Sequence, residues 1–269
     1  MHWYSRESRP KSERGFDIDR WTFLRKTRHW ERLIDQVLLL PASAWLAATA
    51  QQSSLMRDWR NHRTPHVVDT DNFAPMSLEA SRQLLGLEPD SPTIGFLASG
   101  GVTDMRKGWD LLHRSLPIVA DSLPDARVLV VGPMPHLEAR TEIENSSPLP
   151  IDWLGEISSS RELSLVYNAL SALAVPSRED NLPLTALEAQ SCGCPVVAFD
   201  VGGLSEIVIP LRTGGLVPPF DSNRFGEELV KAVKERDEYS LHARAEAVRR
   251  YSRQAVVATY NDALAALLS

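Results

Sequence analysis

Cysteine is scarce in this sequence, and it has no long apolar run. Only two cysteines occur in 269 residues, Cys192 and Cys194, and their C-x-C spacing fits neither a disulfide framework nor a zinc site. We interpret both as buried apolar side chains in a reducing compartment. The apolar segment 37–50 is interrupted by Pro41 and falls short of the roughly twenty residues of a membrane span. The first fifteen residues lack the apolar core of a signal peptide.

Three further absences argue against classes of function or of bound group. The 29 Lys and Arg residues are outnumbered by 35 Asp and Glu residues, and a net charge of -6 argues against a nucleic-acid partner. The first thirty residues are locally basic, and we favour a solvated face there over a phosphate or lipid-headgroup patch. The sequence has no G-x-G-x-x-G, which disfavours a nicotinamide-dependent dehydrogenase. No cluster of candidate ligands has metal-binding spacing, so neither a metal nor another bound cofactor is expected.

Strand and helix patterns alternate along the chain. Short aliphatic runs predict buried strands, and apolar residues at helical spacing predict amphipathic helices. Their alternation predicts an α/β fold with a parallel sheet and right-handed crossovers. Residues 1–20 show no period and are expected to be loosely ordered. The expected strands are 37–40, 93–98, 127–132, 151–154, 173–175, 195–199 and a short one within 212–218. The expected helices are 21–34, 44–52 capped by Ser43, 78–85, 109–120, 161–170, 184–191, 223–234, 239–249 and 253–268.

The stretch 174–208 is the first candidate site. Residues 178–181 form a polar loop at the carboxyl end of an expected parallel strand, where α/β proteins bind ligands. Pro183 suits the first turn of the next helix, whose free backbone N–H groups favour a phosphate. Asp180 and Glu188 are expected near the same mouth, where carboxylates need hydrogen-bond donors such as sugar hydroxyls. The stretch therefore suits a ligand that carries both phosphate and hydroxyl groups.

A second loop, residues 99–108, follows the strand 93–98. Its glycines, Gly101 among them, permit close approach of the backbone to a ligand. Arg106 and Lys107 would place two cations where a diphosphate needs them. A Gly-rich loop with Arg and Lys is, by itself, as often a solvated turn as a phosphate site. If it faces the Asp180 loop, it becomes a candidate phosphate site.

The first candidate stretch resembles the donor-site signature of the family 4 glycosyltransferases, which have the GT-B fold of two Rossmann-like domains. The family pattern is P-S-x-x-E-G-F-G-x-x-x-x-E-A, followed by a Cys-Gly or similar pair, P-V-V-A and G-G-x-x-E. This chain has Asp180 where the family has its first glutamate and 181–183 (N-L-P) in place of G-F-G. The resulting D-N-L-P is a variant found in capsule and exopolysaccharide sugar transferases. The matching residues are Pro176, Ser177, Glu188, Ala189, Cys192, Gly193, Pro195, Gly202, Gly203 and Glu206.

The resemblance implies roles for individual residues. Asp180 would contact the donor sugar or phosphate, the alternative being a helix cap, and Glu188 would contact the ribose, the alternative being a surface carboxylate. Lys107 would hold the donor phosphates, and Arg106 would replace a family arginine that is missing from its usual place. Residues 155–157 resemble the turn that contacts the nucleotide base. The catalytic residues would thus be Lys107, Arg106 and Asp180, and the donor-binding residues Gly101, Ile157, Asn181, Leu182, Pro183, Leu184 and Glu188.

The implied activity is retaining transfer of a hexose from a nucleotide-sugar to a hydroxyl group. The donor would be a UDP- or GDP-sugar, the acceptor a glycan or a lipid-linked molecule, and no metal would be required. Because the departing diphosphate gains negative charge, a cationic site lowers the barrier more than it tightens substrate binding. The setting would be polysaccharide or glycoconjugate biosynthesis, including exopolysaccharide. Two alternatives stay open: a nucleotide-sugar-binding module without catalysis and, more weakly, a sugar-nucleotide epimerase of the same architecture.

The same resemblance implies a domain plan. Residues 69–75 resemble the interdomain segment D-x-x-x-F-x-P. Residues 1–75 would be a partial amino-terminal, acceptor-side domain with its linker, 76–251 the donor-binding Rossmann-like domain, and 252–269 a helix that crosses back. Only the last third of the acceptor domain would be present, so we expect an amino-terminally truncated chain. Either another polypeptide supplies the acceptor half, or the chain keeps a nucleotide-sugar site with little activity; a partner chain or a homo-oligomer is left open. The expected location is cytoplasmic, with peripheral association at the inner membrane face left open.

Overall fold

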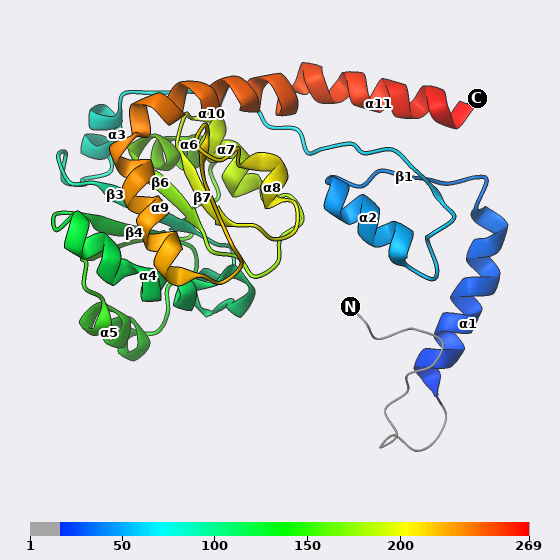
Figure 1. Ribbon diagram of the computed structural model, residues 1–269, viewed down its shortest axis with the longest axis horizontal. Coiled ribbons are helices and arrows are strands. Elements are labelled where there is room, and N and C mark those ends of the chain that lie inside the picture. Colours follow the sequence, from blue (N-terminus) through cyan, green and yellow to red (C-terminus); the bar gives the residue numbers. More distant parts are fainter. Residues whose placement is uncertain (1–16, 269) are drawn as a thin grey trace. The chain divides into compact units, whose positions relative to one another are not determined.

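The computed structural model describes residues 17–268, which divide into two compact units (Figure 1). The described part of the first unit comprises residues 17–64 and 259–268, and the second unit comprises residues 65–258. Most of the stretch expected to be loosely ordered, residues 1–16, lies outside the described residues. Residues 18–20 are helical, contrary to that expectation.

The first unit starts with helices whose beginnings are set by capping side chains. The side chain of Asp17 accepts a hydrogen bond of 2.8 Å from the Arg20 backbone N–H, so the first helix begins three residues before the predicted start. Ser43 caps the second helix through a 3.0 Å bond from the Leu46 N–H, as predicted. Two short strands pair in parallel. The elements are α1 (Ile18–Trp30), the 3-10 turn η1 (Glu31–Leu33), β1 (Leu38–Leu39), α2 (Ala44–Gln52) and β2 (Arg60–Asn61).

The second unit is built on a parallel six-stranded sheet. The strand order is β5-β4-β3-β6-β7-β8, so the chain winds outward from β3 in one direction and then from β6 in the other. This is the doubly wound Rossmann order, with its switch point between β3 and β6. The predicted α/β fold class with a parallel sheet is confirmed. The strands are β3 (Thr93–Leu97), β4 (Arg127–Val131), β5 (Ile151–Gly155), β6 (Ala172–Val175), β7 (Val196–Phe199) and β8 (Gly214–Val217).

Helices cover this sheet (Figure 1). Helix α4 packs against α9, whereas α6 packs against α3 and α7, and α7 packs against α10. The helices are α3 (Leu78–Leu84), α4 (Trp109–Ser122), α5 (Leu137–Ser146), α6 (Ser160–Ala169), α7 (Leu184–Ser191), α8 (Leu204–Ile207), α9 (Ser222–Lys234) and α10 (Arg236–Tyr251); α11 (Arg253–Leu268) has residues in both units. Two 3-10 turns, η2 (Gly101–Thr103) and η3 (Met105–Lys107), follow β3.

The core explains which elements the sequence pattern revealed. The central strands are buried on both faces, so they read as unbroken aliphatic runs. Phe96 on β3 meets Trp109 on α4 edge to face, with ring centroids 5.2 Å apart. Helix α5 was not predicted, because it is largely polar and its Ile143 is only partly buried against the core.

Within residues 17–268, no helix is both long enough and apolar enough to cross a lipid bilayer.

Candidate functional site

The candidate site lies where two loops leave the sheet on either side of its switch point. Residues 99–108 follow β3, and residues 176–183 follow the neighbouring strand β6. Because both strands run in parallel, both loops emerge at the carboxyl edge of the sheet. In doubly wound sheets, ligands bind at this edge, next to the switch point.

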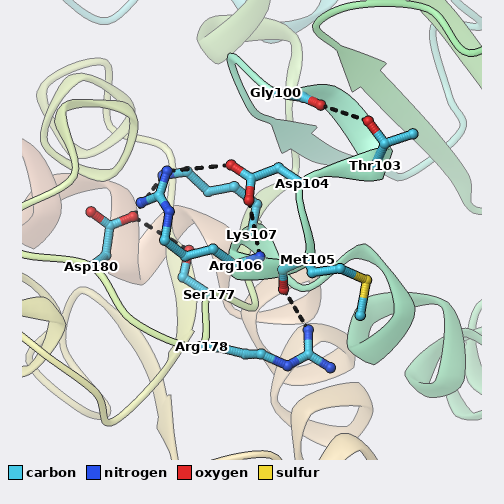
Figure 2. A network of polar contacts seen from close by, with 9 residues as sticks. All are labelled: Gly100, Thr103, Asp104, Met105, Arg106, Lys107, Ser177, Arg178 and Asp180. Carbon is cyan, nitrogen blue, oxygen red and sulfur yellow. Dashed lines mark hydrogen bonds and ion pairs between the residues drawn. The ribbon is translucent and has the colours of Figure 1, made fainter. Parts of the chain in front are cut away.

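Lys107 and Asp180 meet across the two loops. Lys107 Nζ lies 2.7 Å from Asp180 Oδ2, and the two side chains are only 17% and 11% exposed. Ser177 Oγ donates a longer hydrogen bond of 3.4 Å to the same carboxylate oxygen (Figure 2). Pro183, not Asp180, stands at the cap position of α7. Asp180 therefore serves as the partner of a cation and not as a helix cap.

Arg106, the second expected cation, is also paired. Its Nη2 lies 3.3 Å from Oδ2 of Asp104, and its backbone N–H donates to Oδ1 of the same residue at 3.0 Å (Figure 2). The Arg106 side chain is 52% exposed, so this ion pair is weak and easily exchanged. A bound diphosphate would thus take over cations that carboxylates now hold.

A pocket of about 580 Å³ opens at the carboxyl ends of β3, β4 and β5, against α6 and α7. Two of the expected binding residues, Ile157 and Glu188, line it together. Lys107 and Asp180 are outside the described lining, on the loops beside the pocket. The lining residues are Leu97, Ala98, Ser99, Val131, Gly132, Pro133, Glu156, Ile157, Ser158, Leu163, Tyr167, Thr185 and Glu188.

The carboxylate in this pocket has a partner that the sequence reasoning missed. Tyr167 Oη donates a 2.8 Å hydrogen bond to Glu188 Oε2, and the Tyr167 side chain is fully buried. Burial raises the pKa of Glu188, and the hydrogen bond from Tyr167 partly opposes that rise. Burial and then the nearby Glu188 charge raise the pKa of Tyr167 well above its ordinary value. No sequence signal distinguished this tyrosine from the apolar face of α6.

The other expected residues lie around the two loops. Gly101 has a φ of +61°, and a Cβ at this position would lie 2.6 Å from the carbonyl oxygen of the pocket residue Pro133. The glycine therefore allows the β3 loop to lie against the pocket wall. The residues before and at the start of α7 lie at different depths: half-buried Asn181, buried Leu182 and Pro183, and Leu184, which is 48% exposed.

The Gly202-Gly203 turn, part of the matching signature, lies against the loop that carries Asp180. A Cβ on Gly202 would lie 1.8 Å from the carbonyl oxygen of Asp180, and the Gly203 N–H donates to that oxygen at 3.0 Å. The turn after β7 thus supports the backbone of Asp180. The turn therefore influences the site by fixing the position of Asp180.

No metal site is evident in the part of the chain that the structure describes, where no group of three or more His, Cys, Asp or Glu side chains gathers closely enough. The groups able to hold an anion are Lys107, Arg106 and the start of α7, whose cap residue is a proline. A doubly wound sheet with these groups and a carboxylate-lined pocket at its switch point is typical of nucleotide-binding proteins.

Residues 91–235, more than half of the chain, match the family described as glycosyl transferases group 1. The chain belongs to this family. It is 40% identical over 159 residues to the D-inositol 3-phosphate glycosyltransferase of Mycobacteroides abscessus, which covers 56% of this chain and 34% of the relative. The chain spans between a third and a half of the length of such curated relatives.

Two solved structures share the fold of this chain. Sucrose-phosphate synthase from Thermosynechococcus elongatus superposes with a TM-score of 0.73 at 22% identity, over 91% of this chain and 62% of that one. The Anabaena protein HepE in complex with UDP-glucose gives a TM-score of 0.67 at 17% identity, over 90% of this chain and 67% of that one. At these identities the likeness concerns the fold.

Proposed function

We propose that this chain supplies the donor site of a retaining hexosyltransferase of family 4. The donor is a UDP- or GDP-sugar, and the acceptor is a hydroxyl group of a glycan or a lipid-linked molecule in exopolysaccharide or glycoconjugate biosynthesis. The observation that carries the proposal is the Lys107–Asp180 pair at the switch point, beside the Glu188 pocket, in a chain of this family. The Mycobacteroides relative is named for an inositol phosphate and HepE was solved with UDP-glucose, which supports a nucleotide-sugar donor and a hydroxyl acceptor.

The pocket takes the nucleoside in this proposal. The base lies against the turn that contains Ile157, and the ribose hydroxyls donate to Glu188. An ionised carboxylate has about four acceptor positions. Glu188 can therefore accept from ribose while it keeps the hydrogen bond from Tyr167.

The diphosphate lies between the two loops. Lys107 exchanges Asp180 for a phosphate oxygen, because a diphosphate offers more negative charge than one carboxylate. Arg106, which is half exposed, turns from Asp104 to the same group. The charge on the leaving oxygen grows in the transition state, so these cations stabilise it more than they stabilise the bound substrate. Asp180, once released, faces the sugar.

The test is calorimetric titration with UDP, GDP, UDP-glucose and GDP-mannose. We expect the chain to bind one of the two nucleotide series. Lys107→Ala and Glu188→Ala should each weaken binding about tenfold or more, which corresponds to ~1.4 kcal/mol. Lys234→Ala is the matched control: Lys234 ends α9, a helix that starts after β8 at the carboxyl edge and runs back to the opposite edge of the sheet.

Binding by neither series, in protein that circular dichroism shows to be folded, would contradict the proposal. Binding without sugar transfer to added hydroxyl acceptors would favour the second candidate function, a nucleotide-sugar-binding module that needs a partner chain.

A further inference from the structure

Arg178 fastens the two loops of the site to each other. Its backbone N–H donates to the carbonyl of Arg106 at 2.8 Å, and its Nη1 donates to the carbonyl of Met105 at 2.6 Å (Figure 2). The guanidinium also makes a bidentate pair with Asp110, with Nη1–Oδ1 and Nη2–Oδ2 both at 2.8 Å. One residue of the β6 loop thus holds the turn η3, which ends at Lys107, and the first turn of α4, which follows it.

The Asp110 carboxylate accepts two hydrogen bonds from Arg178 and one from Arg114. The hydrogen bond from Arg178 is the largest cause that lowers the pKa of Asp110, and a hydrogen bond from Arg114 adds to it. Arg114 lies one helical turn further along α4, contacts the same carboxylate at 2.7 Å and is 61% exposed. The two arginines therefore share one partner, but only Arg178 reaches across to η3.

The backbones of the two loops also touch beside this clamp. Gly108 has a φ of +73°, and a Cβ there would lie 2.0 Å from the carbonyl oxygen of Pro176. Lys107 sits between this contact and the Arg178 contacts, with its own ion pair to Asp180 as the third link. Of these three links, only the ion pair must break when Lys107 turns to a phosphate.

We propose that Arg178, through Asp110 and η3, is a positioning residue for the diphosphate group of the donor: it keeps Lys107 in place while the lysine exchanges Asp180 for phosphate. The inference rests on the proposed function and deepens it. Arg178 and Asp110 are absent from the described lining of the nucleoside pocket. The clamp therefore acts on the diphosphate and leaves the nucleoside contacts alone.

The test compares UMP with UDP, or GMP with GDP if the chain binds guanine nucleotides. In the wild type, UDP binds more tightly than UMP because the second phosphate reaches Lys107. In Arg178→Ala and Arg178→Lys we expect the dissociation constant of UDP to rise about tenfold, and that of UMP to stay within about twofold. Lys keeps the charge but cannot make the bidentate pair. Arg114→Ala, which removes the other arginine from Asp110, should change neither constant.

Asp110→Asn separates positioning from simple charge. Removal of a negative charge near the phosphates would by itself tighten UDP binding, whereas loss of the clamp weakens it. We expect weaker UDP binding, and no further loss when Asp110→Asn is combined with Arg178→Ala. Asn has nearly the same shape as Asp, so the measurement on Asp110→Asn alone is informative even if Arg178→Ala does not fold.

Unchanged UDP affinity in Arg178→Lys and Asp110→Asn would overturn the inference, as would an equal loss for UMP and UDP. If wild-type protein binds neither nucleotide series, the proposed function fails and the inference falls with it. If the wild type binds a nucleotide but the Arg178 and Asp110 variants do not show the expected loss of UDP affinity, the inference fails and the proposed function is kept.

Discussion

At the scale of single residues, the charged groups of the site are held by one another. Asp180 holds Lys107, Asp104 holds Arg106, and Tyr167 donates to Glu188. If the site binds a nucleoside diphosphate as proposed, the phosphates must replace these carboxylates as partners of the cations. The gain in free energy would then be smaller than an unpaired lysine would give, and ligands with more than one negative charge would be favoured.

In the proposed function, the Tyr167–Glu188 pair gives nucleotide binding a pH dependence. The tyrosine O–H donates to the ionised carboxylate and so lowers the pKa of Glu188, whereas burial raises it above its ordinary 4.5. Tyr167→Phe removes the lowering contribution, so the pKa of Glu188 rises further. Because ribose hydroxyls donate to the ionised form, we expect nucleotide binding to weaken as pH falls, and in Tyr167→Phe to weaken at a higher pH than in the wild type.

Titration calorimetry over the acid range measures this shift. The matched control is Tyr251→Phe, since Tyr251 is also a buried tyrosine but donates to the backbone carbonyl of Glu206. The control should keep the wild-type pH midpoint. An unchanged midpoint in Tyr167→Phe would show that Glu188 does not control the acid limb.

At the scale of elements, the site depends on backbones that touch between loops. The loop after β3 meets the end of β6 at Gly108, and the turn after β7 meets the β6 loop at Gly202. Both glycines have positive φ, with a carbonyl oxygen where a side chain would begin. Small residues at these points let three strand ends converge on Lys107 and Asp180.

Gly108→Ala tests this convergence, and Gly86→Ala controls for the conformation. Gly86 has a φ of +67°, but a Cβ there would meet no atom within 4 Å in the described part of the chain. Gly86→Ala should therefore lower the free energy of unfolding only by the strain of a left-handed alanine, about 1–2 kcal/mol. Gly108→Ala adds the clash with the Pro176 carbonyl. We expect Gly108→Ala to lower the free energy of unfolding, measured by urea denaturation, by at least about twice as much as Gly86→Ala does. We also expect Gly108→Ala to lose UDP binding. Equal losses in the two variants would contradict the loop contact.

Element boundaries were predictable where a local signal marks them. Pro183 and the apolar spacing after it placed α7 at 184–191, where it lies. Ser43 placed the start of α2 in the same way. Helix α5 carries no such signal, because its side chains face solvent more than core. The Lys107 loop was expected opposite the Asp180 loop, but the ion pair between these two residues, which are 73 positions apart, was not predicted. Tyr167, which is 21 positions from its partner Glu188, was also missed.

At the scale of the whole molecule, alternation of strands and helices predicted the parallel sheet but not its order. The order β5-β4-β3-β6-β7-β8 follows from contacts between distant segments, which no local pattern records. It places the β3 loop beside the β6 loop at the switch point. The resemblance identified both loops, and the fold explains why they act together. Arg178 also joins the two loops, through its contacts with η3 and with Asp110 at the start of α4. This link becomes visible only when the two loops are seen together in the fold.

A crystal structure of the chain with UDP, or with GDP if that series binds, tests the central claim most directly. We expect the base and ribose in the pocket with Glu188, and Lys107 Nζ at about 2.8 Å from a phosphate oxygen. Asp180 should have lost its contact with Lys107, and Arg178 should still hold Asp110. A nucleotide bound elsewhere, or a Lys107–Asp180 pair that stays intact beside the bound diphosphate, would contradict this account.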